Sequence, residues 1–440
     1  MGRVHIYDKD FGYTCLKPVV DWNLRHSYRK LEVVDQDNVP TDGAVIFAPN
    51  HCNTLMDALV MLRANKCTTV FGARADLFNN KLIGSIMTFL RILPMVRQRD
   101  GLRNVLKNNE TQEIVVATLK NKVGFCVFPE GRHRPEKSLL QLGKGVFRAA
   151  LAANAEFGDK MPVYIVPVGI DYGDFFRYRS TALVKYGKPI NVTEFVRNSQ
   201  ADNDAQMIEP LRKELTQKIS ELFTFIKDGD ALREKWMLTK MVAIATEDKG
   251  YGNFGTSLHQ AMLDNRSIIS GIEKACEEHP QEMSELFEDI AKFDRYRRKD
   301  GISIYSFRKG NTVSNNIGKG FAALAGLPFF LFSAIASLPL WLTYFILKKS
   351  IKDRAFHNTV GFGIKLGGGI ILSIIYAALA FCLAPWWAAL PAWALTIPTY
   401  SFFFDYLEGC RRWFSDMKIH KCRKLKKAFN EIMKKYARLK

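Results

Sequence analysis

The sequence predicts an α/β protein with a mostly parallel sheet flanked by helices, followed by a helical insertion and a C-terminal membrane-embedded helical unit. Three observations support this prediction. Over residues 30–195, short apolar or β-branched runs alternate with amphipathic stretches, the pattern of parallel strands joined by crossover helices. Residues 200–310 are charged and follow a helical pattern. Residues 321–347 and 366–404 contain no charged side chain and are long enough to enter a membrane.

The amino-acid composition of the chain indicates which class of molecule it binds. The chain has 440 residues, of which 48% are apolar, and a formal net charge of +19, which suits an anionic partner. The basic residues gather beside apolar runs, so we expect an anionic phospholipid membrane and no nucleic acid. The eight cysteines are scattered without a CxxC pair, which argues against a zinc site or a disulfide framework and favours a reducing compartment.

The apolar runs in the first region are the expected strands, and the amphipathic stretches between them are the expected helices. The strands are AVIFA (44–48), TTVFGA (68–73), GFCVF (124–128) and VYIVPVGI (163–170). The helices are Thr54 to Ala64, Glu110 to Leu119 and Gly145 to Ala153.

Composition divides the chain into six parts. We expect an N-terminal membrane-surface or packing segment over 1–39, the α/β domain over 40–200, a helical insertion or cap over 201–312, a first hydrophobic membrane segment over 321–347, a second segment or hairpin over 366–404, and a basic tail over 409–440. The first 40 residues are polar and carry acidic groups, so no cleavable signal peptide or presequence is expected there.

Charges around the apolar segments leave the number of membrane spans open. The basic residues before the first segment and in the tail predict that both flanks are cytoplasmic, together with the α/β domain. Two spans would then place the basic loop 348–354 outside, against the rule that positive loops stay inside. Prolines such as Pro328 and Pro391 allow kinks, and a hairpin that dips in and returns would remove the conflict.

The stretch PNHCNTLMDAL (49–59) has two interpretations. In the first, Thr54 is the N-cap of a helix and Asp57 completes a capping box. In the second, His51 lies in the preceding loop and folds back onto Asp57. The carboxylate would hold one ring nitrogen and leave the other as a base. On this stretch alone both interpretations stay open.

A second polar stretch, GFCVFPEGRHR (124–134), is an apolar strand that runs into a turn rich in cations. The carboxyl edge of a parallel sheet is where α/β proteins bind ligands, and arginines there can hold a phosphate. The alternative is a surface turn with solvated charges.

These residues resemble the glycerolphosphate and lysophospholipid acyltransferases. That family has four blocks, and here they read Asn50-His51 with Asp57, then Leu93 to Arg97, then Phe128 to Gly131, then Val166 to Gly169, in the family's order. The resemblance covers roughly 40–190, and FPEG is its most specific part. It implies a glycerolphosphate-acyltransferase-like fold and an HxxxxD-type site.

Two departures from the family pattern matter. Five residues separate His51 from Asp57 where the family has four, which resembles a branch that includes fungal glycerol-3-phosphate acyltransferases. The family's arginine after FPEG falls on His133, so Arg132 or Arg134 would supply the phosphate contact, and the sequence does not choose between them.

The resemblance implies a membrane-bound O-acyltransferase of phospholipid biosynthesis, with its catalytic domain on the cytoplasmic face. His51 would be the general base and Asp57 its partner, and the donor would be acyl-CoA or acyl carrier protein, with no cofactor and no metal. The implied substrate-binding residues are Arg97, Glu130, Gly131, Arg132 and Arg134. Glu130 would anchor the site or contact a glycerol hydroxyl, and backbone N–H groups near Gly131 would stabilise the oxyanion.

The acceptor stays open at this point. The apolar C-terminal unit favours lysophosphatidate, and the first block favours glycerol-3-phosphate, with other lysophospholipids as further alternatives. A protein of another class, a lipid-binding membrane protein with a catalytically dead site, also fits the charge and the apolar segments.

Overall fold

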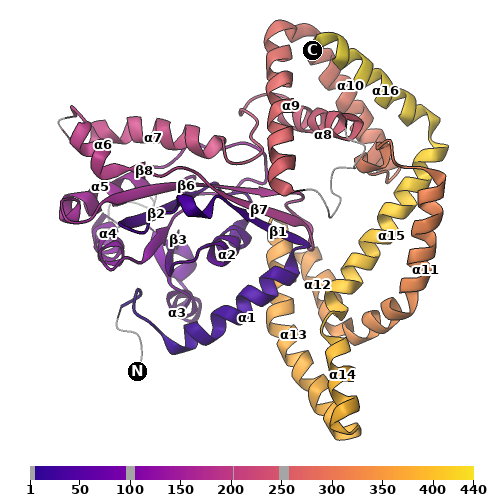
Figure 1. The fold of residues 1–440 in the computed structure, drawn as a ribbon, viewed down its shortest axis with the longest axis horizontal. Helices are drawn as coiled ribbons and strands as arrows, with labels where there is room; N and C mark the ends of the chain where they lie inside the picture. Colours follow the sequence, from indigo (N-terminus) through magenta and orange to yellow (C-terminus); the bar gives the residue numbers. More distant parts are fainter. Residues whose placement is uncertain (1–4, 96–104, 202, 247–256) are drawn as a thin grey trace. The chain divides into compact units, whose positions relative to one another are not determined.

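The computed structural model describes residues 5–95, 105–201, 203–246 and 257–440, which fold into two compact units (Figure 1). Unit 1 comprises Met1–Arg25, Leu31–Phe175 and Thr181–Phe223. Unit 2 comprises His26–Lys30, Phe176–Ser180 and Thr224–Lys440.

Unit 1 is built on an eight-stranded sheet with the order β1-β7-β6-β2-β5-β3-β4, and β8 pairs with β6 beside this path. The strands are β1 Lys30–Val34, β2 Ala44–Pro49, β3 Thr69–Arg74, β4 Ile92–Met95, β5 Gly124–Cys126, β6 Val163–Tyr172, β7 Thr181–Tyr186 and β8 Ile190–Asn191. The ladders from β6 through β2, β5 and β3 to β4 are parallel, whereas β7 and β8 are antiparallel to β6. The predicted mostly parallel α/β sheet is thus present.

Helices connect and cover these strands. They are α1 Phe11–Ser27, α2 Thr54–Ala64, α3 Lys81–Phe89, α4 Val105–Lys120, α5 Gly145–Phe157, α6 Val192–Asn198 and α7 Asp204–Ser220, with short 3-10 turns at η1 Gln36–Asn38 and η2 Ala75–Phe78. Helices α4 and α5 pack against each other and against β2, and α2 packs on β7. The central strand β2 is buried at all six positions, which is why its sequence is a continuous apolar run rather than an alternating one.

The carboxyl ends of the parallel strands bring the sequence motifs to one edge of the sheet. In the β2–β6 ladder Pro49 pairs with Val168, and in the β2–β5 ladder Phe47 pairs with Cys126. The residues that follow these three strands therefore meet at the same edge, where α/β proteins place their ligands.

Unit 2 is helical. Its helices are α8 Leu232–Thr246, α9 Leu258–Glu278, α10 Pro280–Lys299, α11 Val313–Ala336, α12 Leu338–Ser350, α13 Phe356–Leu383, α14 Trp386–Thr396, α15 Thr399–Lys421 and α16 Arg423–Leu439, with a 3-10 turn η5 at Ile304–Phe307. Helices α8, α9, α10 and α16 share a buried apolar core that includes Leu238, Ile272, Leu286 and Phe429.

Two helices of unit 2, α11 and α13, are long and apolar enough to cross a membrane. Their most apolar stretches are largely exposed within the protein. Side chains such as Ile335, with 76% of its surface exposed, and Ile374, with 64%, face outward. An exposed apolar surface of this extent fits contact with lipid better than contact with water.

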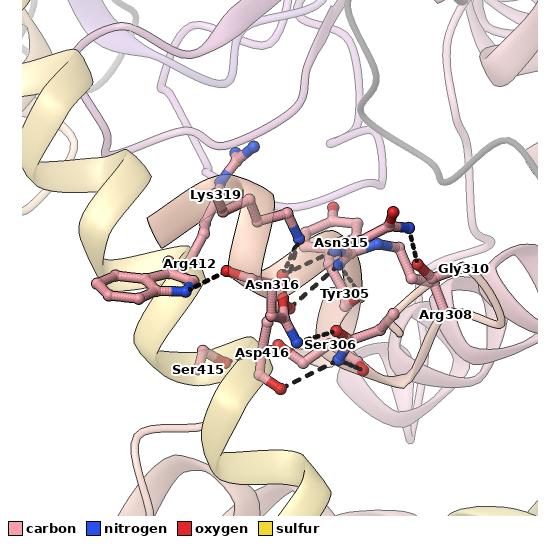
Figure 2. A network of polar contacts seen from close by, with 12 residues as sticks. Tyr305, Ser306, Arg308, Gly310, Asn315, Asn316, Lys319, Arg412, Ser415 and Asp416 are labelled. Carbon is pink, nitrogen blue, oxygen red and sulfur yellow. Dashed lines mark hydrogen bonds and ion pairs between the residues drawn. The ribbon is translucent and has the colours of Figure 1, made fainter. Parts of the chain in front are cut away.

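A buried polar network holds the start of α11 against α15 (Figure 2). Asp416, with a side chain only 3% exposed, accepts hydrogen bonds from Arg308 Nη2 at 2.7 Å and Lys319 Nζ at 2.6 Å. Beside it, Ser306 and Ser415 share a hydrogen bond of 2.7 Å. Burial alone would raise the pKa of Asp416, but the bonds from the two cations outweigh it and lower that pKa below its ordinary value.

Candidate active site

The turn after β2 is fixed to the neighbouring strand by Asn50. Its Oδ1 accepts a hydrogen bond of 2.6 Å from Ile170 N, and its Nδ2 donates one of 3.1 Å to Ile170 O. This buried side chain therefore completes the ladder where β2 ends and positions the next residue, His51, at the carboxyl edge of the sheet.

His51 and Asp57 are in contact. His51 Nδ1 lies 2.8 Å from Asp57 Oδ2, and 17% of the histidine side chain is exposed while the aspartate is fully buried. The extra residue between them does not separate the pair. The imidazole is thus oriented by a carboxylate, with its second nitrogen, Nε2, on the opposite side of the ring.

The same carboxylate also caps the helix that follows. Asp57 Oδ2 accepts hydrogen bonds from Cys52 N at 2.8 Å and Asn53 N at 2.7 Å. The N-cap is Asn53, so the expected N-cap at Thr54 was wrong by one residue; Thr54 begins α2 and adopts a left-handed φ of 47°. Asp57 therefore both accepts the backbone N–H groups that precede α2 and contacts the His51 ring.

Tyr172, at the end of β6, completes the environment of Asp57. Its Oη donates a hydrogen bond of 2.8 Å to Asp57 Oδ1, the oxygen that does not face His51. The tyrosine is 2% exposed and lies 115 residues away in sequence. No motif in the sequence pointed to Tyr172, although its place at the end of the strand that contains VPV, which pairs with β2, puts it at the same edge of the sheet.

A buried ion pair lies next to Tyr172. Lys137 Nζ contacts Asp171 Oδ1 and donates a hydrogen bond of 2.8 Å to Tyr172 O. The lysine also lies 5.0 Å from the centre of the Phe175 ring. A buried cation that is paired in this way fixes the end of β6 and the loop that carries Lys137.

Neither cysteine near the site is suited to nucleophilic attack. Burial, followed by the negative charge of Asp57, raises the pKa of the Cys52 thiol well above its usual value. Burial likewise raises the pKa of Cys126. Thiols that stay protonated at neutral pH are poor nucleophiles.

The FPEG turn follows β5. Gly131 N donates a hydrogen bond of 3.1 Å to Phe128 O, and Gly131 has a positive φ of 65°, which glycine adopts without strain. This N–H is thus bonded within the turn. Phe128 stacks on the His51 ring, with ring centres 4.3 Å apart.

Glu130 connects the FPEG turn to the histidine. Its Oε1 accepts a hydrogen bond of 2.6 Å from His51 N, and its Oε2 accepts one of 2.8 Å from Leu140 N. Burial raises the pKa of Glu130 to about 7, although the two backbone N–H groups oppose this shift. Through these two hydrogen bonds the Glu130 side chain links the backbone of the His51 turn to that of the Leu140 segment.

The basic residues after FPEG differ in their surroundings. Arg132 is exposed. Arg134 is partly buried: its guanidinium contacts Ser138 Oγ and Glu136, and its backbone N donates a hydrogen bond of 3.1 Å to His51 O. The His133 ring centre lies 5.8 Å from that of His51, edge to face. Arg97, the remaining basic residue predicted at the site, lies outside the described residues.

No group of three or more His, Cys, Asp or Glu side chains is placed to hold a metal ion within the part of the chain that the structure describes. The polar groups gathered around His51 are its imidazole, the Asp57 carboxylate and hydrogen-bond donors. An imidazole oriented by a carboxylate can accept and return a proton.

Comparisons with known proteins agree with this arrangement. The family model described as Acyltransferase matches residues 30–171, the segment that carries β2, FPEG and β6. Over 127 residues the chain is 32% identical to glycerol-3-phosphate O-acyltransferase 2 of Saccharomyces cerevisiae. This matched stretch covers 29% of this chain and 17% of the yeast protein. Residues 30–171 thus form an acyltransferase-family domain, and these similarities support the glycerolphosphate and lysophospholipid acyltransferase family.

Two further similar proteins can be named. Glycerol-3-phosphate O-acyltransferase 1 of Saccharomyces cerevisiae is 24% identical over 235 residues, 52% of this chain and 29% of that protein. The chain thus spans less than a third of either yeast relative. The crystal structure of the 1-acyl-sn-glycerophosphate (LPA) acyltransferase PlsC from Thermotoga maritima covers 49% of this chain and 80% of its own, at 18% identity and a TM-score of 0.34.

Proposed function

We propose that this acyltransferase moves an acyl group from an acyl thioester, acyl-CoA or acyl carrier protein, to a hydroxyl of a glycerolphosphate acceptor. His51 Nε2 takes the hydroxyl proton while the oxygen attacks the thioester carbonyl. When the tetrahedral intermediate collapses, the C–S bond breaks and the imidazolium returns a proton to the thiolate. The observation that supports this most is the 2.8 Å contact between His51 Nδ1 and the fully buried Asp57.

Asp57 has two tasks in this mechanism. It holds the ring so that Nε2 points away from the carboxylate, and it stabilises the imidazolium that forms as the proton is taken. Its hydrogen bonds from Cys52 N, Asn53 N and Tyr172 Oη keep the carboxylate from turning. The base is thus preorganised before substrate binds.

The acceptor's phosphate is expected beside the FPEG turn. Arg132 is exposed there, whereas the guanidinium of Arg134 is held by Ser138 and Glu136. We therefore assign the phosphate contact to Arg132, and the support of the loop and of the His51 backbone to Arg134. A guanidinium suits this contact because it can bind phosphate oxygens bidentately.

Two acceptors compete. Similarity to two yeast glycerol-3-phosphate O-acyltransferases favours glycerol-3-phosphate. The exposed apolar helices α11 and α13 favour lysophosphatidate, which resides in a bilayer. Both carry a free hydroxyl near a phosphate, so the site chemistry is the same for each. With its apolar helices in the membrane and its +19 charge, the protein would work at an anionic surface on the cytoplasmic face.

The test is an acyl-transfer assay of the full-length protein in detergent. Acyl-CoA and acyl carrier protein are each offered with glycerol-3-phosphate, lysophosphatidate, lysophosphatidylcholine and glycerol, and the products are read by lipid mass spectrometry. We expect a new ester on glycerol-3-phosphate or lysophosphatidate and none on glycerol, which has the hydroxyl groups but lacks the phosphate. Absence of any ester on the phosphate-bearing acceptors, with either donor, would contradict the proposal.

A further inference from the structure

The two charge-free segments of unit 2 each fold back on themselves. Helix α11 ends at Ala336, and α12 starts at Leu338 after a single break at Ser337. Helix α13 ends at Leu383, and α14 starts at Trp386 after Ala384 and Pro385. Each segment therefore contains a turn without charged residues in its middle, and Figure 1 shows the chain reversing at both places.

Helix α12 runs antiparallel to α13. Tyr376 Oη donates a hydrogen bond of 2.7 Å to Ala336 O, at the start of the α12 arm. Further along, Leu340 packs at Gly368, and Tyr344 at Gly361. Successive residues of α12 thus contact progressively earlier residues of α13. The turn at Ser337 therefore lies near the middle of α13, and the end of α12 lies near the start of α13.

Helix α14 and the beginning of α15 return along the same helix. Trp393 Nε1 donates a hydrogen bond of 3.0 Å to Ser373 Oγ, and Lys365 Nζ donates one of 3.0 Å to Ser401 Oγ. The arm from 366 to 383 is about 27 Å long at 1.5 Å per residue, close to the thickness of a hydrocarbon core. Its tip is apolar and very exposed, with Leu383 82% and Trp386 72% accessible.

The end of α12, which leads into loop 351–355, lies close to the point where the charged part of α15 begins. Lys348 Nζ is 5.6 Å from the centre of the Tyr344 ring, and that ring is 5.2 Å from the ring of Phe404, which precedes Asp405. Lys348 therefore lies at the level where the second apolar segment ends. A topology with two separate spans would instead place about 30 Å of hydrocarbon between them.

The short segment 176–180 also shows that the loop between the hairpins and α15 lie close together. The Arg354 guanidinium lies 4.6 Å from the centre of the Phe176 ring, while Arg177 pairs with Glu408 on α15. Arg179 Nη2 lies 2.5 Å from Asp405 Oδ2. Four consecutive residues, which span no more than about 14 Å, thus contact both the loop and α15.

The charges at this base suit an anionic membrane surface. The carboxylates of Asp405 and Glu408 face more arginines than they can neutralise, namely Arg29, Arg177, Arg179, Arg411 and Arg412. The last turn of α12 adds Lys348 and Lys349, and the loop that follows adds Lys352. This surplus of positive charge lies where the apolar helices end, which is the level of phospholipid phosphates.

We propose that the apolar segments are two hairpins that enter and leave a phospholipid bilayer through one face, so that loop 351–355 lies on the same side as the basic tail. No charged group then has to cross the membrane, and the conflict with the positive-inside rule disappears. The inference rests on the membrane attachment in the proposed function and is independent of acyl transfer.

The test uses single-cysteine variants in a background in which Cys15, Cys67, Cys276, Cys382, Cys410 and Cys422 are replaced by serine, leaving the two buried cysteines. Lys352→Cys reports on the exposed loop, Lys427→Cys on the tail, where the lysine is 80% exposed, and Trp386→Cys on the tip. A membrane-impermeant maleimide is applied to spheroplasts and to inverted vesicles of an expressing bacterium.

We expect the loop and tail variants to be labelled in the same preparation only, and the tip variant to be labelled only after detergent is added. Labelling of loop and tail from opposite sides would overturn the proposal. So would labelling of the tip in intact membranes from the side that labels the tail, or release of the protein by alkaline carbonate. Acyl transfer in detergent is measured on the same variants, so loss of activity and a wrong topology are read separately.

Discussion

Tyr172 Oη donates a hydrogen bond of 2.8 Å to Asp57 Oδ1, while His51 Nδ1 lies 2.8 Å from the other oxygen of the same carboxylate. The last residue of β6 therefore sets the orientation of the carboxylate that orients the proposed base. This relationship makes Tyr172 a positioning residue rather than a catalytic one.

Replacing this tyrosine tests its positioning role. Tyr172→Phe removes a bond to a buried carboxylate, so we expect a loss of about 1.5 to 3 kcal/mol in the free energy of unfolding. The turnover number, kcat, should fall roughly 10- to 100-fold with little change in KM, because a misplaced base loses about that much rate. Steady-state kinetics and urea unfolding measure the two effects.

The matched control is Tyr186→Phe. Tyr186 is also fully buried, and its Oη bonds to Asn65 Oδ1 at 2.6 Å, away from the His51 pair. This variant should lose stability but keep its kcat. Equal losses of kcat in both variants would show that Tyr172 acts only through stability.

The titration of Glu130 should contribute to the pH dependence of the free energy of unfolding. Its pKa is about 7 in the folded protein, because of burial, against an ordinary 4.5. The folded state therefore holds this proton where the unfolded state has lost it, so stability falls as pH rises from about 5 to about 7.5. In urea unfolding at several pH values, Glu130→Gln should show a flatter profile than the wild type. Parallel profiles would contradict this.

The two arginines after FPEG should separate by kinetics. Arg132→Gln is expected to raise the KM for the phosphate-bearing acceptor about 10-fold, the loss of one charge-assisted bond, without changing the KM for the thioester. Arg134→Gln should instead lower stability and kcat. The Arg134 guanidinium holds the loop through Ser138, and the Arg134 backbone N in that loop donates to His51 O. The opposite assignment would follow if only Arg134→Gln raised the acceptor KM.

The network around Asp416 should dominate the stability of the α11–α15 contact. Asp416→Asn leaves the cations of Arg308 and Lys319 without their carboxylate, and we expect a loss of about 3 to 5 kcal/mol. The control, Asp289→Asn, removes the exposed pair with Lys435 and should cost about 1 kcal/mol or less. Thermal unfolding in detergent compares them; similar losses in both variants would rule out a special role for Asp416.

The sequence predicted the elements whose pattern is local. Helix α2 has the predicted bounds, and β2 and β6 lie where continuous apolar runs stand, because a strand buried on both faces leaves that trace. The contact between His51 and Asp57 was also predicted, since the carboxylate lies on the helix that starts after the histidine loop.

What the sequence did not show depends on long-range register. The bond from Tyr172 to Asp57 joins residues 115 apart and exists because β6 pairs with β2 in one register. The pairing of Lys137 with Asp171 has the same origin. The folding back of the apolar segments was undecided because a stretch without charges gives the same pattern whether it crosses a membrane or returns.

The most direct test of the proposed mechanism compares His51→Ala with the wild type in the acyl-transfer assay, with His133→Ala as a neighbouring-histidine control. Removal of a general base should lower kcat roughly 10²- to 10⁴-fold, while His133→Ala keeps most of the activity. Binding to anionic vesicles should be unchanged in both variants. If His51→Ala transfers acyl groups to the phosphate-bearing acceptor at the wild-type rate, His51 is not the base and the mechanism is wrong.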